Sequence, residues 1–186
     1  MGLIGHNGGP SVEEGESWRR HCWTAARAAL LPTLPIEVLR TRVKRAADLG
    51  LDYRTYASVR AATGHDVVAF LFSSNALRVT PVRLRMPQGQ AAKLALVRAD
   101  RIGLAQGRIA PEALAGVNPE LDRADPAPDL LARFGDAGRQ LRGILGRVPG
   151  DRVILVGDME LERDWCAAGR LAGYLPAARY FGAAGP

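Results

Sequence analysis

The chain has 186 residues, a hydrophobic content of 47% and a formal net charge of +6. This apolar content is too high for a disordered chain and is sufficient for the core of one domain. No apolar run approaches the roughly 20 residues of a membrane-spanning helix, and the N-terminus lacks the basic start and apolar core of a secretory signal. We therefore expect a cytoplasmic protein without a membrane partner. Two cysteines, Cys22 and Cys166, provide neither a disulfide framework nor a metal-binding spacing.

The positive charge is concentrated in residues 18–110. Residues 18–64 carry nine Arg or Lys against three acids, and residues 65–110 carry seven against two, whereas both ends of the chain are net negative. Such asymmetry is typical of a protein with an anionic partner, most often nucleic acid. The alternative is compositional, because only Lys44 and Lys93 are lysines, and arginine with abundant Ala and Gly is also what a GC-rich genome produces.

The chain is predicted to have three sections. Residues 1–16 are Gly-rich and then acidic, which predicts a flexible tail. Residues 17–64 predict a helical section, since apolar residues recur there at helical spacing. Residues 65–186 predict an α/β section, and we expect it to form one compact domain with residues 17–64.

Stop and start signals divide the helical section into helices. Gly50 and Gly64 suit the position after a helix end, and Asp52 suits the N-cap of the helix that follows. The predicted helices cover about Trp18–Leu31, Ile36–Leu49 and Tyr53–Ala62.

The second and third of these helices resemble a helix-turn-helix. Ala46, Gly50, Tyr56 and Val59 have the spacing of its small residue, its turn glycine and the apolar positions of its second helix. The third helix would then enter the major groove of DNA. The alternative is an ordinary pair of helices packed on the sheet. The side chains predicted to contact nucleic acid are Arg40, Arg42, Lys44, Arg45, Tyr53, Arg54, Ser58 and Arg60.

Two apolar runs predict buried strands. Val67–Phe72 is six apolar residues in a row, and Arg152–Gly157 has the same character. The alternative for such a run is a buried helix, because periodicity alone does not separate the two. We expect them to be neighbours, covered on both faces by helices at about 130–145 and 160–171. The predicted fold is a small three-layer α/β domain with a mostly parallel sheet flanked by helices and a helical N-terminal section.

The remaining segments give weaker signals. Val79–Arg85 alternates apolar and polar residues, which predicts a short edge strand containing Pro81. A helix is predicted from Pro87 to Val97 and another from Leu130 to Leu145, with Asp129 as its cap. Residues 100–128 give no clear pattern.

A second candidate site lies where the predicted strands end. Asp158 and Glu162 follow the strand at 152–157. Glu162 lies in a helix predicted over about Glu160–Leu171, whose inward face includes Leu161 and Trp165. Ligands of open parallel sheets bind at the carboxyl ends of the strands. The alternative is that these acids are solvated and complement the helix dipole. The predicted site set is Ser73, Ser74, Asn75, Asp158 and Glu162.

Three short patches resemble the haloacid-dehalogenase-like phosphatases. They are Gly157-Asp158 with a further acid, the strand end at Phe70–Asn75, and Lys93. The resemblance implies a magnesium ion held by the acids. That family also requires a nucleophilic aspartate in an Asp-x-Asp motif, and the chain has none. The chain is therefore not expected to belong to this family.

The leading hypothesis is a small non-enzymatic nucleic-acid-binding protein that uses the basic helical section. One alternative is an enzyme-like domain that binds phosphate or a nucleotide at the strand ends. Another is an interaction subunit whose partner is an acidic protein, and homodimerisation also remains open. No cofactor is expected, except Mg²⁺ under the enzyme-like alternative.

Overall fold

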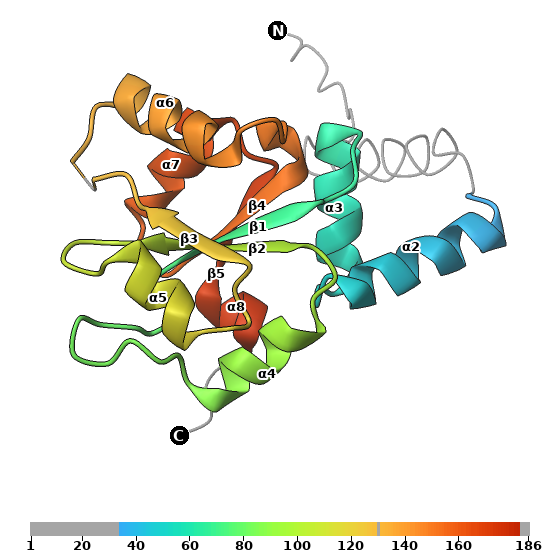
Figure 1. Ribbon diagram of the computed structural model, residues 1–186. Coiled ribbons are helices and arrows are strands. Elements are labelled where there is room, and N and C mark those ends of the chain that lie inside the picture. Colours follow the sequence, from blue (N-terminus) through green and yellow to red (C-terminus); the bar gives the residue numbers. More distant parts are fainter. Residues whose placement is uncertain (1–33, 130, 183–186) are drawn as a thin grey trace, which may run out of the picture. The chain divides into compact units, whose positions relative to one another are not determined.

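The computed structural model describes residues 34–129 and 131–182 (Figure 1). The chain divides into two units, Met1–Leu39 and Arg40–Pro186, and the sheet with its helices belongs to the second. The predictions for the tail, for the helix at Trp18–Leu31 and for Cys22 lie outside the described residues. Among the residues described, none of the helices has the length and apolar character needed to cross a bilayer.

The core of the fold is a five-stranded sheet in which every strand pair is parallel. Its order is β3-β2-β1-β4-β5. The predicted neighbours are confirmed, because β1 and β4 pair directly, with Phe70 opposite Ile154. The strands are β1 (Ala69–Ser73), β2 (Asp100–Ala105), β3 (Arg123–Pro126), β4 (Val153–Gly157) and β5 (Gly173–Pro176).

Helices cover both faces of the sheet and complete the three-layer α/β fold (Figure 1). A single 3₁₀ turn, Gly150–Arg152, leads into β4. The α-helices are α2 (Ile36–Asp48), α3 (Tyr53–Thr63), α4 (Gln88–Leu96), α5 (Pro111–Val117), α6 (Phe134–Leu145), α7 (Glu162–Gly169) and α8 (Ala177–Phe181).

Alternate residues of β1 enter two separate apolar cores. Phe70 and Phe72 pack in the core that includes residues of α3, α4 and α8. Ala69 and Leu71 pack in the core that includes residues of α6 and α7. Because side chains alternate along a strand, a run of apolar residues is needed when both faces are covered.

The prediction that the helices at 130–145 and 160–171 cover opposite faces is wrong. Residues of α6 and α7 belong to one core, on one face. Crossovers between parallel strands are right-handed, so helices whose crossovers advance in the same direction along the sheet share a face. The β3-α6-β4 and β4-α7-β5 units advance in one direction, and the β1-α4-β2 and β2-α5-β3 units advance in the other.

The predicted glycines at the ends of α2 and α3 and the predicted N-cap of α3 are confirmed. Gly50 and Gly64 have φ values of 66° and 76°, the left-handed region that glycine adopts without strain. Asp52 caps α3 by accepting a hydrogen bond of 2.8 Å from the Thr55 amide. Hydrogen bonds from the Thr55 hydroxyl and from the Thr55 amide hold the pKa of Asp52 below its usual value. A DNA-binding role for this helix pair stays a prediction.

Two predicted elements differ from the structure, and one stretch without a prediction contains regular structure. Val79–Arg85 is a loop with one isolated bridge, between Thr80 and Arg83, rather than an edge strand. The helix expected at Leu130 begins at Phe134. The unassigned stretch 100–128 contains β2, α5 and β3.

Candidate functional site

The strand order places a topological switch point between β1 and β4. The chain leaves β1 toward β2 on one side and leaves β4 toward β5 on the other. In open parallel sheets, ligands bind beside the carboxyl ends of the strands at such a point. Four residues of the predicted strand-end site, Ser73, Ser74, Asn75 and Asp158, lie on or directly after these two strands, and Glu162 begins the helix that follows β4.

Glu162 is the centre of a polar network at the switch point. It lies in the first turn of α7, yet its side chain is fully buried. Its Oε2 accepts hydrogen bonds from the amides of Asp158 (2.7 Å) and Met159 (3.2 Å). Its Oε1 accepts from Asn75 Nδ2 and Gln106 Nε2, both at 3.0 Å. The expectation that this acid is a solvated part of the helix end is therefore wrong for Glu162.

The close approach of this carboxylate depends on Gly157 at the end of β4. A Cβ atom at this position would collide with Glu162 Oε2 and with the Tyr174 ring. Burial, followed by the charge of Glu162, raises the pKa of Tyr174 to about 12, so its hydroxyl remains protonated at neutral pH. That hydroxyl donates to the Met159 carbonyl at 3.1 Å.

Gln106, which follows β2, joins the two strand ends and was not found from the sequence. Its Oε1 accepts from Ser74 Oγ at 2.8 Å and from the Asn75 amide at 3.3 Å. Ser73 Oγ accepts from the Ala76 amide and stabilises the turn after β1. The structure thus brings the predicted residues together, but their hydrogen bonds are made to one another, to Gln106 and to neighbouring residues.

This set of side chains does not suit Mg²⁺. A hard cation needs carboxylate or carbonyl oxygens with free lone pairs, and four N–H groups already point at Glu162. Asp158 and Glu160, in the connection between β4 and α7, are exposed to solvent. Within the described ranges, no group of three or more His, Cys, Asp or Glu is arranged to hold a metal ion.

The residues predicted to bind nucleic acid lie on α2 and α3, and one of them has a structural role. Arg45 Nε donates to Asp66 at 2.9 Å, and its two terminal nitrogens donate to the carbonyls of Arg98 and Val67 at 2.9 and 2.8 Å. Asp66 also accepts from the Tyr56 hydroxyl at 2.9 Å. The guanidinium of Arg45 therefore fastens α2 to the start of β1.

We expect Arg45→Ala to lower the free energy of unfolding by about 2–3 kcal/mol, since a hydrogen bond to a charged group contributes about 1.5–3 kcal/mol. The neighbouring Lys44→Ala, at an exposed position, should change it by less than about 0.5 kcal/mol. Urea denaturation measures both. Equal effects of the two substitutions would contradict this role of Arg45.

The other residues of the predicted helical site are less tightly held. Arg60 Nη1 lies 3.9 Å from Asp66 Oδ1, and Tyr53 packs against the core. Arg40, Lys44, Arg54 and Ser58 are exposed, and Arg42 is half-buried. Helix α3, which leads into β1, lies on the side of the sheet where β1 begins, away from the strand ends that carry Glu162 (Figure 1).

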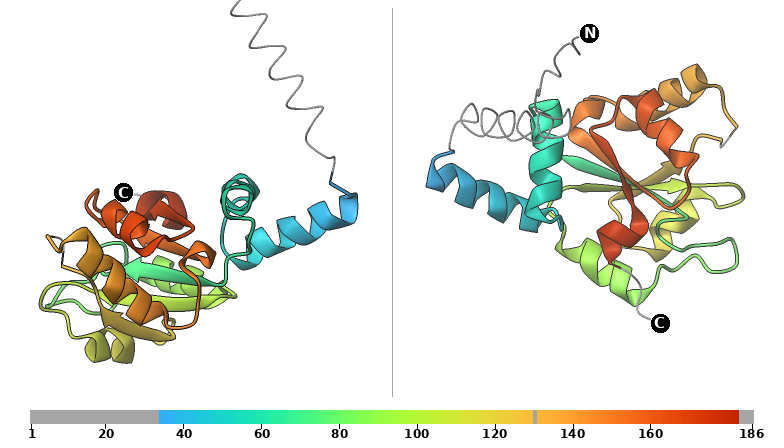
Figure 2. Two further views of the ribbon diagram at one scale, coloured as in Figure 1. Left: turned by 90° about the horizontal axis from the view of Figure 1, so that it is seen from above. Right: turned by 180° about the vertical axis from the view of Figure 1, so that it is seen from behind.

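A second basic surface lies on the two loops that follow β1 and β2. Figures 1 and 2 show both loops at the end of the sheet where the strands finish. Arg78, Arg83 and Arg108 are exposed, and within residues 34–129 and 131–182 their side chains make no hydrogen bond or ion pair. No Asp or Glu occurs between Asp66 and Asp100, nor between Asp100 and Glu112. We name these three arginines the edge arginines.

Other arginines near the sheet are neutralised by partners. Arg85 forms a bidentate salt bridge with Glu120, in which both N–O distances are 2.6 Å. Arg101 Nη2 lies 2.6 Å from Asp122 Oδ1. The signal for the edge arginines was present in the charge of residues 65–110. Only the structure separates the paired residues from the unpaired ones.

Comparison with known proteins gives no relative from which a function can be transferred. No family model matches the sequence, and neither a curated protein nor a solved structure matches it. The function of this chain is therefore inferred from its own sequence and structure.

Proposed function

We propose that the protein binds nucleic acid through the carboxyl end of its sheet, with the edge arginines contacting phosphates. The proposal rests on which arginines form ion pairs and which do not. Arg78, Arg83 and Arg108 are exposed and unpaired in the described part of the chain, on loops that carry no acid. An unpaired guanidinium offers five N–H donors in a fork that fits phosphate oxygens.

The predicted helical surface is the competing location for the same function. Arg45 is already bonded to Asp66 and two carbonyls, and Arg60 lies beside Asp66. Fewer of its charges are therefore available to phosphates than the sequence suggests. Lys44 and Arg54 are two of its exposed basic residues and provide a matched comparison.

Two double variants of equal charge test the location. Arg83→Ala with Arg108→Ala removes two edge arginines, and Lys44→Ala with Arg54→Ala removes two charges from the helices. Each phosphate contact to a single strand contributes about −0.7 to the log–log slope of affinity against salt, so the edge variant should flatten the slope by about 1.4 units. The helix variant should leave the slope close to that of the wild type.

Fluorescence anisotropy with a labelled oligonucleotide, titrated at low and moderate salt, measures these slopes. Absence of binding at low salt would contradict the proposal. A flatter slope in the helix variant alone would place the contacts on α2 and α3. Binding of poly-glutamate in preference to the oligonucleotide would identify an acidic protein as the partner.

A further inference from the structure

A groove lies between the ends of α6 and α7 and the turn that leads into β4. Its walls are Arg142, residues 145–150, Gly169 and Arg170, and its volume is about 630 Å³. Pockets that hold small ligands have volumes of about 300–1,000 Å³. Because α6 ends and β4 begins within these walls, the groove lies at the amino end of the strands, and none of the edge arginines lines it.

Three arginines, Arg142, Arg147 and Arg170, make this groove basic, and we name them the groove arginines. All three are exposed, and within the described ranges their side chains make no hydrogen bond or ion pair. None of the described residues that line the groove is Asp or Glu. The nearest acid along the chain, Asp151, lies with its Oδ2 3.6 Å from His65 Nε2. The groove therefore carries three positive charges that no described carboxylate neutralises.

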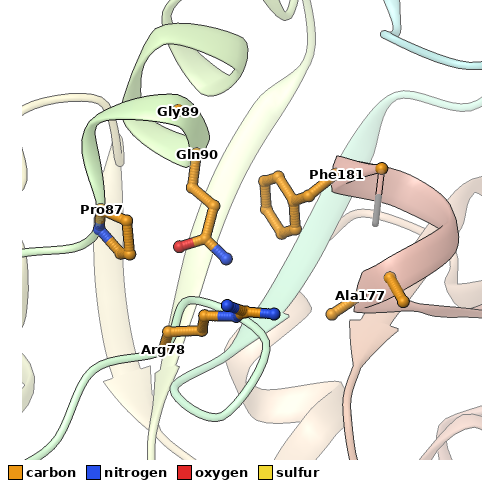
Figure 3. A pocket seen from close by; sticks show the side chains of 8 residues that line it. Arg78, Pro87, Gly89, Gln90, Ala177 and Phe181 are labelled. Carbon is orange, nitrogen blue, oxygen red and sulfur yellow. The ribbon is translucent and has the colours of Figure 1, made fainter. Parts of the chain in front are cut away.

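The pocket between α4 and α8 is less basic (Figure 3). Its volume is about 180 Å³, and Arg78 is the one charged side chain among the residues drawn around it. One exposed guanidinium binds an anion only weakly in water, since an isolated surface ion pair contributes little. Three guanidinium groups around one groove can act on a single ligand together, so the groove is the stronger candidate for an anion site.

Close backbone contacts hold the walls of the groove in place. A Cβ atom at Gly150 would collide with the carbonyl oxygen of Gly169, and one at Gly138 would collide with that of Ala168. The amide of Ala172 also donates to the Gly150 carbonyl at 3.0 Å. These contacts fix the end of α7 against α6 and against the turn before β4, so a ligand would not have to order the walls on binding.

Arg170 is held in a conformation that glycine would adopt more easily. It is the C-cap of α7, and its φ value is 51°, in the left-handed region. Glycine is the usual residue at such a helix end because it has no Cβ atom. Strained conformations of this kind cluster at active sites and ligand clamps. The strain therefore points to a role for the Arg170 side chain.

We propose that this groove binds an oligophosphate, a chain of linked phosphate groups, through the groove arginines. The fork of N–H donors on each guanidinium fits phosphate oxygens. A single phosphate group carries at most about two negative charges at neutral pH, whereas a chain of phosphates can neutralise all three arginines in one compact ligand. Free triphosphate and the triphosphate tail of a nucleotide share this chemistry. The inference does not depend on the proposed function, because the edge arginines lie outside the groove.

Isothermal titration calorimetry at low salt and without divalent cations tests the chemistry, with tripolyphosphate, orthophosphate and citrate as ligands. Tripolyphosphate should bind at least about tenfold more tightly than orthophosphate, because it reaches more than one guanidinium and each exposed ion pair contributes up to about fivefold. Citrate, a tricarboxylate, should bind more weakly than tripolyphosphate. Absence of tripolyphosphate binding at millimolar concentration, or equal affinity for all three ligands, would overturn the inference.

Arg142→Ala and Arg170→Gly should each weaken tripolyphosphate binding by about fivefold. Arg170→Gly should leave the melting temperature unchanged or slightly raised, because glycine adopts positive φ readily, so its loss of affinity cannot come from unfolding. Arg133→Ala is the matched control, since Arg133 is exposed at the other end of α6 and its substitution removes the same charge. An equal loss of affinity in Arg133→Ala would show that the ligand senses net charge alone, which contradicts the inference.

ATP in place of tripolyphosphate separates the two sources of the phosphate chain. Equal affinities would show that the chain alone is recognised, and tighter binding of ATP would identify a nucleotide; both results support the inference. The edge variant, Arg83→Ala with Arg108→Ala, should bind tripolyphosphate as the wild type does, so the nucleic-acid proposal can fail without this one. An oligonucleotide whose binding Arg142→Ala weakens, together with no binding of tripolyphosphate, would make the groove a nucleic-acid surface and overturn the inference.

Discussion

Replacing Glu162 by alanine is expected to lower the free energy of unfolding by about 3–5 kcal/mol, the usual range when one partner of a buried charged network is removed. Four N–H groups lose their acceptor, two from the backbone after β4 and two from the side chains of Asn75 and Gln106. Each donor left without its acceptor is costly, and these four converge on one fully buried carboxylate.

Chemical denaturation with urea measures this change, with Asp158→Ala as the control. Asp158 lies four residues before Glu162 and has an exposed carboxylate, so its substitution should cost less than about 0.5 kcal/mol. Glu162→Gln should lie between the two, because one amide oxygen keeps accepting while its NH₂ group faces donors. A loss below about 1 kcal/mol for Glu162→Ala would show that the network does not stabilise the fold.

The second large effect is expected at Trp165. Its side chain is 2% exposed and packs with Leu141 and Leu155 between α6, α7 and the sheet. Trp165→Ala should therefore lower the free energy of unfolding by about 3–5 kcal/mol, from lost apolar burial and the cavity that remains.

Leu161→Ala is the matched control for this prediction. Leu161 was expected on the same buried face, but its side chain is 44% exposed. Its substitution should cost less than about 1 kcal/mol, since little apolar surface leaves the core. Equal losses at the two positions in thermal or urea melts would contradict the orientation of α7.

The central strands were predictable from the sequence because both of their faces are buried. Val67–Phe72 and Val153–Val156 are continuous apolar runs, the pattern typical of strands with both faces covered. β2 and β3 gave no such signal. β2 contains Gly103, where a side chain would crowd Leu121, and β3 is a four-residue edge strand with partly exposed residues.

The candidate site was only partly predictable. The parallel-sheet rule placed Ser73–Asn75 and Asp158 at one edge, and the structure does bring them together. The burial of Glu162 depends on the absence of a side chain at Gly157, and its bond to Gln106 joins residues far apart in the sequence. Neither feature leaves a periodic pattern in the chain.

The pairing of charges was also hidden from the sequence. Arg45 was predicted to face a partner, and it instead bonds to Asp66 and to two backbone carbonyls. Arg85 looked equivalent to Arg83, but Glu120 is bonded to the former alone. Which arginine remains unpaired is decided by contacts between distant segments.

Hydrogen–deuterium exchange with and without a single-stranded oligonucleotide tests the central claim most directly, because it reports which loops the ligand covers. If the edge arginines bind the oligonucleotide, exchange should be slower in residues 74–87 and 106–110, the loops that carry them. Exchange in α3, at the other end of the sheet, should be unchanged. Protection confined to residues 40–63, with the two loops unaffected, would contradict the account and return the binding surface to the helices.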